Sequence, residues 1–591
     1  MTTFPRATQE ACMRAYPALV SIGCITAAGF LTSCQDASQS PPMRPEVPVE
    51  QDPAGSMLES LDLVYVCGNK FLATNATSSA VQVTYRVAGT SETGGLTLRQ
   101  GPGEDPGYSE TELQTENPGV VELYQDEQLV ARRRNEGVPC GAAAISASVA
   151  ALGTEATTGK WSAPFAWPIV AVHLHLLPNG RLLSFGKNGI PYIWNPSTKE
   201  FTPSPSPSWL FCSGHAFLPD GRLLVNGGHL SDNHGIPDAN LYNATTATWT
   251  SAPSMAKGRW YPTTTTLANG QAVTLAGRDQ SGAVVTIPEV WTGTGWRALT
   301  GASRSLPYYP RTFLAPNGKV FYAGEKQSTY YLSTSGTGSW SSVGSRRYGT
   351  RDYGSAVMYE PGKVLYAGGG RTTNTAEIID LNQPGPAWQW TGSMAYPRRH
   401  LNATILPTGQ VLVTGGTNGT AFSDESRPVY PAELWDPATG TWTTLASSSV
   451  IRAYHTTALL LRDGRVLLTG SGDGDGVTAQ LNAEIFSPPY LFKGARPAIS
   501  SWPGSARYGQ SFFIGTSQAS TIDKVTLVRL GSVTHAFDSN QRFNRLSFVP
   551  AAGGLTVTTP ASANLAPPGH YRLFIVNTNG VPSTGKSFRL K

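Results

Sequence analysis

The sequence predicts an all-β protein that is rich in turns, and three observations support this class. Glycine and proline are abundant, at 63 and 44 of 591 residues, and only 14% of the positions are charged. One strand-and-turn pattern recurs seven times, and segments with alternating apolar residues flank it on both sides. A chain of this length can form two or three domains, each with its own core.

The N-terminus has the features of an export signal. Arg6 and Arg14 precede an apolar stretch of small residues that ends in Leu31-Thr32-Ser33-Cys34. Because these small residues resemble the lipobox of bacterial lipoproteins, residues 1–34 are predicted to be a lipoprotein-type signal peptide; an ordinary cleaved signal is the alternative. We therefore expect an exported protein, either a cell-surface lipoprotein or a secreted one, with a lipid anchor as its only membrane contact.

Residues 35–160 are predicted to hold a linker and a small β domain. The segments Val81–Tyr85 and Val121–Tyr124 alternate as strands do, and Cys67 and Cys140 bracket them. A Cys67–Cys140 disulfide suits an oxidising compartment. If Cys34 is the anchor, this pairing leaves Cys212 as an odd thiol, which indicates unusual chemistry in an exported protein.

Seven copies of the repeat fill residues 161–494. Each copy has a glycine turn, a short β-branched or leucine-rich strand and then a further glycine or glycine pair. The turn glycines are Gly180, Gly221, Gly270, Gly318, Gly362, Gly409 and Gly464, at intervals of 41 to 55 residues. Because this period suits one four-stranded blade, we predict a seven-bladed β-propeller of the kelch type. Its recurring tryptophans are expected to fill the gaps between blades.

The repeat stops after Phe492, and residues 495–591 are predicted to form an immunoglobulin-like β-sandwich that closes the channel of the propeller. Strands such as Lys524–Val528 and His570–Val576 alternate in the way that this fold requires. A propeller is a scaffold used for many activities, so the function is expected to come from residues at the mouth of its channel.

Three residues whose side chains can bind a metal or react precede a turn glycine by the same interval. Cys212, Tyr261 and His455 each lie nine residues before the turn glycine of their repeat. Equivalent positions in a propeller converge on its axis, so we expect these side chains to surround one point. Tyr454, and His535 on a loop of the C-terminal domain, complete a set of two phenols and two imidazoles, which suits tetragonal Cu(II).

From about Pro168 to Lys591 the chain resembles the galactose oxidase and glyoxal oxidase superfamily of copper-radical oxidases. The matching motifs are Phe211-Cys212, Arg259-Trp260-Tyr261, Ile451-Arg452-Ala453-Tyr454-His455, Thr534-His535 and Gly580-Val581-Pro582-Ser583. The resemblance implies that Tyr261, Tyr454, His455 and His535 bind a copper ion. It also implies that Cys212 is joined through sulfur to the ring of Tyr261, forming a Cys-Tyr thioether radical cofactor.

The resemblance also implies a reaction: a primary alcohol or an aldehyde hydrate loses two electrons, and O₂ is reduced to H₂O₂. Tyr454 would take the hydroxyl proton, the Tyr261 radical would abstract hydrogen from carbon, and copper would take the second electron. We expect a monomer that acts on a small alcohol, an aldehyde or a carbohydrate. The alternative is a non-catalytic kelch propeller that binds glycans or proteins at the cell surface.

One position departs from the family pattern. Galactose oxidase has a tryptophan stacked over its thioether 18 residues after the crosslinked tyrosine, whereas this chain has Asp279 there. A carboxylate cannot shield a radical as an indole does, so radical stability and substrate identity stay open. Arg259-Trp260-Tyr261 is more similar to the glyoxal oxidases.

Other candidate sites are weaker. His173 and His175, at strand spacing, could chelate a metal, although packing is the favoured interpretation. The formal net charge of +5 is scattered, without a basic stripe interleaved with aromatics, so no nucleic-acid partner is expected. No glycine-rich phosphate loop occurs between a strand and a helix.

Overall fold

The computed structural model describes residues 61–591, apart from residues 68, 76–78, 99–108, 136–153 and 475. Strands dominate this part of the chain, and its one α-helix, α2 (Glu155–Thr158), is a single turn. The predicted all-β class is therefore confirmed. No helix among the described residues is long and apolar enough to cross a membrane. The predicted signal peptide and the Cys67–Cys140 disulfide lie outside what is described.

Two antiparallel sheets form between residues 61 and 134. The first consists of β1 (Leu61–Cys67), β2 (Lys70–Asn75) and β5 (Ser109–Gln114), and the second of β4 (Thr93–Leu98), β3 (Val81–Val87), β6 (Val120–Gln125) and β7 (Gln128–Arg134). Buried and exposed side chains alternate along β3, so Val81, Val83 and Val87 face the core of this region.

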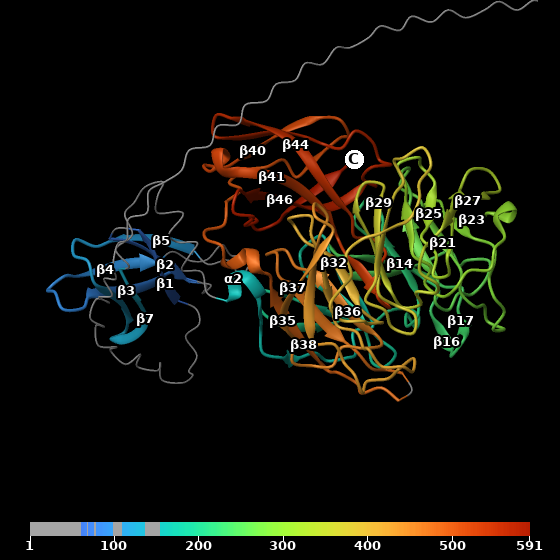
Figure 1. Cartoon of the computed structure of the whole chain (residues 1–591), viewed down its shortest axis with the longest axis horizontal. Coiled ribbons are helices and arrows are strands. Elements are labelled where there is room, and N and C mark those ends of the chain that lie inside the picture. Colours follow the sequence, from blue (N-terminus) through green and yellow to red (C-terminus); the bar gives the residue numbers. More distant parts are fainter. Residues whose placement is uncertain (1–60, 68, 76–78, 99–108, 136–153, 475) are drawn as a thin grey trace, which may run out of the picture. The chain divides into compact units, whose positions relative to one another are not determined.

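Seven antiparallel sheets follow, which we number 1 to 7. Sheets 2 to 6 have four strands each, whereas sheet 1 has six and sheet 7 has five. Figure 1 labels strands from most of them. Sheet 1 has β10 (His173–Leu176), β11 (Leu182–Phe185), β12 (Tyr192–Trp194) and β13 (Phe201–Pro203); sheet 2 has β14 (Gly214–Phe217), β15 (Leu223–Asn226), β18 (Ala239–Asn243) and β19 (Thr248–Ala252); sheet 3 has β20 (Thr263–Thr266), β21 (Ala272–Leu275), β22 (Glu289–Trp291) and β23 (Trp296–Ala298). Between β15 and β18 the chain forms a separate two-stranded hairpin of β16 (His229–Ser231) and β17 (His234–Gly235).

The remaining four sheets have the same topology. Sheet 4 has β24 (Thr312–Leu314), β25 (Val320–Tyr322), β26 (Ser328–Ser333) and β27 (Ser339–Ser345); sheet 5 has β28 (Ser355–Glu360), β29 (Lys363–Ala367), β30 (Ala376–Asp380) and β31 (Gln389–Trp390). Sheet 6 has β32 (Asn402–Ile405), β33 (Val411–Thr414), β34 (Pro431–Asp436) and β35 (Thr441–Ser447); sheet 7 has β36 (Thr456–Leu460), β37 (Val466–Gly470), β38 (Asn482–Ser487) and β8 (Lys160–Trp161).

The first and last sheets are joined. The fourth strand of sheet 7, β8, comes from the chain before sheet 1, and β9 (Phe165–Ala166) pairs with the same neighbour, β38. The first strands of adjacent sheets also contact one another: β14 with β20, β20 with β24, β28 with β32, β32 with β36, and β36 with β10. Strand β36 of the last sheet therefore lies beside β10 of the first.

A glycine turn connects the first and second strands of each of the seven sheets, as predicted. The seven turn glycines have φ values between 78° and 91°, in the left-handed region that glycine adopts without strain. At Gly270 a Cβ atom would also lie 2.6 Å from the ring of Pro219. The repeated glycine is thus required both by the backbone conformation and by close packing.

In four of the sheets a buried arginine–glutamate ion pair joins the segment before the first strand to the third strand. In each pair the arginine precedes the first strand and the glutamate belongs to the third strand, and both side chains are at most 4% exposed. The pairs are Arg259–Glu289, Arg351–Glu377, Arg398–Glu433 and Arg452–Glu484. A paired buried charge avoids the large cost of an isolated one, so these residues hold the entry to the first strand against the sheet.

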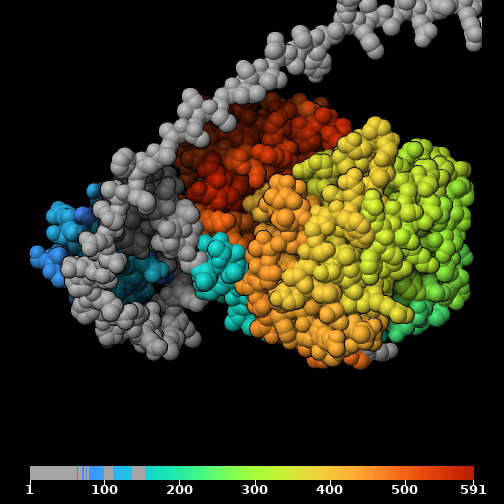
Figure 2. Space-filling model, viewed as in Figure 1, coloured from blue at the N-terminus to red at the C-terminus, as the bar shows by residue number. Residues whose placement is uncertain are grey.

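The C-terminal region forms a seven-stranded sheet with its own core (Figure 2, red), and it packs on the repeated sheets through contacts such as Thr526 Oγ1 to the Pro407 carbonyl. The strand order is β39 (Ser505–Ala506), β47 (Lys586–Leu590), β46 (Gly569–Asn577), β41 (Ile522–Arg529), β44 (Phe543–Ala551), β45 (Gly554–Thr558) and β40 (Ser511–Gly515).

One hairpin leaves this C-terminal sheet. Strands β42 (Ser532–Thr534) and β43 (Phe537–Asp538) extend sheet 1, where Thr534 pairs with His173 of β10. The turn of this hairpin carries His535. The C-terminal region thereby inserts a histidine among the first strands of the repeated sheets.

Candidate functional site

Six residues just before a first strand share an unusual backbone conformation. Each lies nine residues before the turn glycine of sheets 2 to 7, and each has a φ between 45° and 67°. They are Cys212, Tyr261, Tyr309, Tyr353, His400 and His455. Left-handed backbone in residues other than glycine costs free energy and often marks a functional site. The interval predicted Cys212, Tyr261 and His455; Tyr309, Tyr353 and His400 were missed, although the same interval selects them.

The five residues predicted from the sequence lie together in one buried cluster. The hydroxyl oxygens of Tyr261 and Tyr454 are 2.7 Å apart. The ring of His535 lies 4.6 Å from the rings of both Tyr261 and His455, measured between centroids. Cys212 is fully buried, and its carbonyl accepts a hydrogen bond from the Tyr261 amide at 2.9 Å.

Hydrogen bonds at Nδ1 fix the ring orientation of His455 and His535. His455 Nδ1 lies 2.5 Å from the Gly472 carbonyl, and His535 Nδ1 lies 2.6 Å from Thr534 Oγ1. The Thr534 hydroxyl donates to the Val172 carbonyl, so it accepts from His535. Each imidazole therefore carries its proton on Nδ1, which leaves an electron pair on Nε2.

Both Nε2 atoms are buried and have no hydrogen-bond partner in the described structure. A buried polar atom without a partner is costly, and a metal ion bound at these atoms would remove that cost. Two imidazole nitrogens and two phenol oxygens form a donor set that suits Cu(II). The residues present therefore fit a copper ion.

Burial keeps the cluster uncharged in the metal-free protein. Desolvation lowers the pKa of His455 to about 3 and the pKa of His535 well below its usual value. Desolvation also raises the pKa values of the Cys212 thiol and of the Tyr261 and Tyr454 hydroxyls. A bound divalent cation would stabilise the phenolate form of the tyrosines, which burial disfavours, and the neutral imidazoles, which burial already favours.

An aromatic residue other than the one compared in the sequence covers the Tyr261 ring. The indole of Trp260 stacks on this ring, with a centroid distance of 3.8 Å and an interplanar angle of 11°. Asp279, at the position where galactose oxidase has its tryptophan, instead accepts hydrogen bonds from Ser281 and from the Ala283 amide. The sequence pattern considered only position 279, whereas the stacked indole belongs to the residue directly before Tyr261.

The missed residues form the surroundings of the cluster. The ring of Tyr309 stacks on His535 at 4.5 Å, and Tyr353 contacts Tyr454 at 5.7 Å. His400 Nε2 donates to the carbonyl of Phe422, whose ring lies 4.9 Å from that of Tyr454 and is 39% exposed. Tyr454 is the most exposed of the five predicted residues, at 9%, so a small molecule would approach from its side.

His173 and His175 take part in hydrogen bonds with other side chains, in agreement with the packing interpretation. In the part of the chain that the structure covers, no group of three or more His, Cys, Asp and Glu residues could hold a metal. The cluster around Tyr261 differs from such a group because two of its four donors are phenols.

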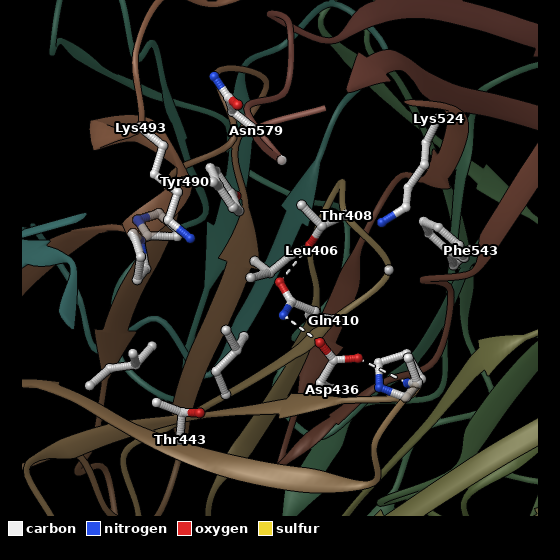
Figure 3. Close-up of a pocket in the computed structure, with 18 of the residues that line it drawn as sticks. Leu406, Thr408, Gln410, Asp436, Thr443, Tyr490, Lys493, Lys524, Phe543 and Asn579 are labelled. Atoms are coloured by element: carbon white, nitrogen blue, oxygen red, sulfur yellow. Dashed lines mark hydrogen bonds between the residues drawn. The ribbon is translucent and has the colours of Figure 1, made fainter. Parts of the chain in front are cut away.

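One cavity of the described structure lies away from this cluster. It has a volume of about 840 Å³ and is lined by sheets 5 to 7 and the C-terminal sheet (Figure 3). Its polar side chains largely bond one another, as Thr408 with Gln410 and Gln410 with Asp436. A second cavity of about 490 Å³ is lined by Asp352 and Arg399, the immediate neighbours of Tyr353 and His400. Neither cavity is lined by Tyr261, Tyr454, His455 or His535.

Family models match two parts of the chain. The model described as "Galactose oxidase-like, Early set domain" matches residues 496–590, and the model described as "Glyoxal oxidase N-terminus" matches residues 358–490. The first match covers the C-terminal sheet and the second covers most of sheets 5 to 7, so together they include Tyr454, His455 and His535.

Several curated proteins of similar sequence are named as oxidases. A galactose oxidase of Gibberella zeae is 29% identical over 487 residues, which cover 73% of this chain and 70% of the relative. The aldehyde oxidase GLOX of Vitis pseudoreticulata is 28% identical over 450 residues, covering 64% of this chain and 82% of the relative. A solved structure described as a "novel fungal alcohol oxidase with catalytic diversity among the AA5 family, in complex with copper" matches with a TM-score of 0.68 and 27% identity, covering 73% of this chain and all of that one.

Proposed function

We propose that this chain, a copper-radical oxidase homologous to galactose oxidase and the GLOX aldehyde oxidases, oxidises a small primary alcohol, an aldehyde or a carbohydrate end outside the cytoplasm and produces H₂O₂. The observation that carries this proposal is the pair of buried, unpartnered Nε2 atoms of His455 and His535 beside the paired hydroxyls of Tyr261 and Tyr454. The rival function, a glycan- or protein-binding propeller, gives no reason for these two nitrogens to lack partners.

The proposed architecture is a seven-bladed kelch-type propeller closed by an immunoglobulin-like sandwich. Its support is the order of sheets 1 to 7, each with the same turn, and the pairing of β8 with β38. In a propeller such a pairing closes the ring, because one blade takes strands from both ends of the repeat. Of the boundaries proposed from the sequence, 35–160, 161–494 and 495–591, the first falls inside β8, between Lys160 and Trp161.

Tyr261, Tyr454, His455 and His535 would hold the copper ion. When bound, copper supplies a one-electron acceptor and lowers the pKa of the phenols that contact it. Tyr454 would take the proton of a substrate hydroxyl, and its support is that it is the most exposed of these four residues. Tyr261, in its radical form, would take a hydrogen atom from the adjacent carbon.

The reaction is balanced by O₂. The substrate carbinol loses two hydrogens and two electrons, which converts an alcohol to an aldehyde, or an aldehyde hydrate to a carboxylic acid. O₂ accepts both electrons and both protons and becomes H₂O₂. The Cys212–Tyr261 thioether would form in a reaction with the same balance, in which the S–H and ring C–H bonds break, an S–C bond forms and a second O₂ becomes H₂O₂.

The cellular location and the partners of the protein are proposed from the sequence alone. We propose an exported protein, anchored through lipidated Cys34 or released after cleavage of residues 1–34, and active as a monomer. Export would give the enzyme O₂ and extracytoplasmic substrates. Membrane fractionation of the expressed full chain and of its Cys34→Ala variant tests the anchor: the variant should move to the soluble fraction, and an unchanged distribution would refute lipidation.

Peptide mass spectrometry tests the chemistry directly. After addition of copper and air, we expect the peptides that contain Cys212 and Tyr261 to be joined, with the loss of two hydrogens. Cys212→Ser should give separate peptides. Separate peptides in the wild-type protein would refute the radical-oxidase function and favour the binding propeller. If the link forms, a peroxide assay with glyoxal-type aldehydes, glycerol, galactose and polysaccharides identifies the substrate class.

A further inference from the structure

A continuous chain of buried hydrogen bonds connects Cys212 to the hairpin β42–β43. The Cys212 amide donates to His173 Nε2 at 3.1 Å, and His173 Nδ1 lies 3.2 Å from His215 Nε2. His215 Nδ1 lies 2.6 Å from Ser532 Oγ, which lies 2.8 Å from His175 Nδ1. None of these five residues is more than 2% exposed. We call His173, His215, Ser532 and His175 the histidine relay.

The direction of every hydrogen bond in the histidine relay is fixed by one backbone amide. The Cys212 N–H can only donate, so His173 accepts at Nε2 and carries its proton on Nδ1. His173 then donates to His215 Nε2, and His215 Nδ1–H donates to Ser532. The hydroxyl proton of Ser532 is left for His175. This arrangement needs three neutral imidazoles, and burial lowers the pKa of each of them.

The histidine relay joins three segments that are distant in the sequence. His173 and His175 belong to β10, His215 to β14 and Ser532 to β42, and 317 residues separate His215 from Ser532. At one end the relay holds the amide of Cys212, whose φ of 63° is unfavourable for a residue with a side chain. At the other end it fixes the hairpin whose turn carries His535.

We infer that the histidine relay positions Cys212 and His535 around Tyr261 and thereby sets the rate of thioether formation. This inference rests on the proposed function. The four residues are positioning residues, since they reach the reacting sulfur and ring only through Cys212 and through the hairpin. Bond formation requires the Cys212 sulfur to be held against the ring of Tyr261, and a freed Cys212 amide would let the strained backbone relax away from it.

The test follows thioether formation in single variants of the full chain. Copper-free protein receives copper in air, and mass spectrometry measures the fraction of joined Cys212 and Tyr261 peptides over time. His173→Phe keeps a ring of similar size but removes the acceptor for the Cys212 amide, and Ser532→Ala opens the relay at the hairpin. We expect each to slow the linking about tenfold, the effect of a barrier raised by about 1.4 kcal/mol.

Two further variants separate positioning from general stability. Thr526→Val removes another buried hydroxyl of the C-terminal region, which donates to Pro407, and should link at the wild-type rate. His173→Gln places an amide oxygen where it can accept from the Cys212 N–H, and should recover most of the rate lost in His173→Phe. Circular dichroism of each variant verifies that the fold is kept.

The outcomes distinguish the two proposals. Linking in the wild type with equal rates in His173→Phe, Ser532→Ala and Thr526→Val would overturn the role of the histidine relay and leave the proposed function intact. A rate in His173→Gln as low as that in His173→Phe would also count against it. Absence of linking in the wild type itself would overturn the proposed function together with the inference that depends on it.

Discussion

The indole of Trp260 lies flat on the phenol ring of Tyr261, with centroids 3.8 Å apart and planes inclined by 11°. Its Nε1 donates to His229 Nδ1 at 3.1 Å, and His229 in turn packs against Trp209 and Phe211. The stacked indole is thus held by a hydrogen bond as well as by packing. It covers one face of the ring on which the radical is proposed to reside.

Replacement of the indole should shorten the life of the radical. In Trp260→Leu we expect the oxidised form to decay roughly two- to tenfold faster, the factor that corresponds to the 0.5–1.5 kcal/mol of an aromatic stacking contact. The decay of the visible absorption after removal of an oxidant measures this. Asp279→Asn serves as the control and should decay like the wild type. An equally faster decay in both variants would show that the stacked indole does not protect the radical.

Copper should stabilise the protein only when both imidazole nitrogens are present. At free copper one hundred times its Kd, binding contributes about 2.7 kcal/mol to the free energy of unfolding, which raises Tm. His535→Ala should lose most of this increase because one of four ligands is missing. His570→Ala, on β46 away from the cluster, should keep it. A full copper-dependent increase of Tm in His535→Ala would exclude His535 as a ligand.

The buried ion pair Arg398–Glu433 should be sensitive to the loss of one partner. Both side chains are fully buried, so Glu433→Gln leaves the Arg398 guanidinium without a compensating charge. We expect a loss of about 3–5 kcal/mol in the free energy of unfolding. The double variant Arg398→Met, Glu433→Met should lose less, because it removes both charges. Urea unfolding measures all three proteins, and a double variant less stable than Glu433→Gln would contradict this account.

The copper-free protein should lose stability as the pH falls below about 6.5. Burial lowers the pKa of His215 to about 3, whereas an unfolded histidine titrates near 6.5. Between these values the unfolded chain binds one more proton, so His215 contributes a loss of about 1.4 kcal/mol per pH unit, and His175 acts in the same direction. Buried Asp538 has the opposite effect on stability. Burial raises its pKa to about 6, so below that pH the Asp538 carboxyl binds a proton in the folded state before it does so in the unfolded chain.

The measurement is the free energy of unfolding at pH 7.5, 6 and 5. We expect a decrease with falling pH, with a slope that is smaller by about 1.4 kcal/mol per pH unit in His215→Gln. Phe185→Leu, which alters packing against His173 and His175 without removing a titratable group, should keep the wild-type slope. A stability that does not change between pH 6.5 and 5, or an unchanged slope in His215→Gln, would contradict this prediction.

The sequence alone was sufficient for the all-β class and for much of the candidate site. Turn glycines that must adopt positive φ recur in every repeat, and a fixed interval from them identifies equivalent backbone positions. Cys212, Tyr261 and His455 were recognisable in this way, since local geometry is repeated with the sequence. Tyr309, Tyr353 and His400 could have been found by the same interval, but only the structure drew attention to their shared left-handed conformation.

Other features depend on tertiary structure. His535 lies on a hairpin of the C-terminal region, and Ser532 on the same hairpin meets His215 across 317 residues; no local pattern encodes such contacts. The shielding of Tyr261, which Asp279 left open, depends on where the Trp260 side chain points and not on a distance along the chain. The repeat thus determined which positions surround the cluster, whereas the packing of distant segments decided which atoms complete, cover and support it.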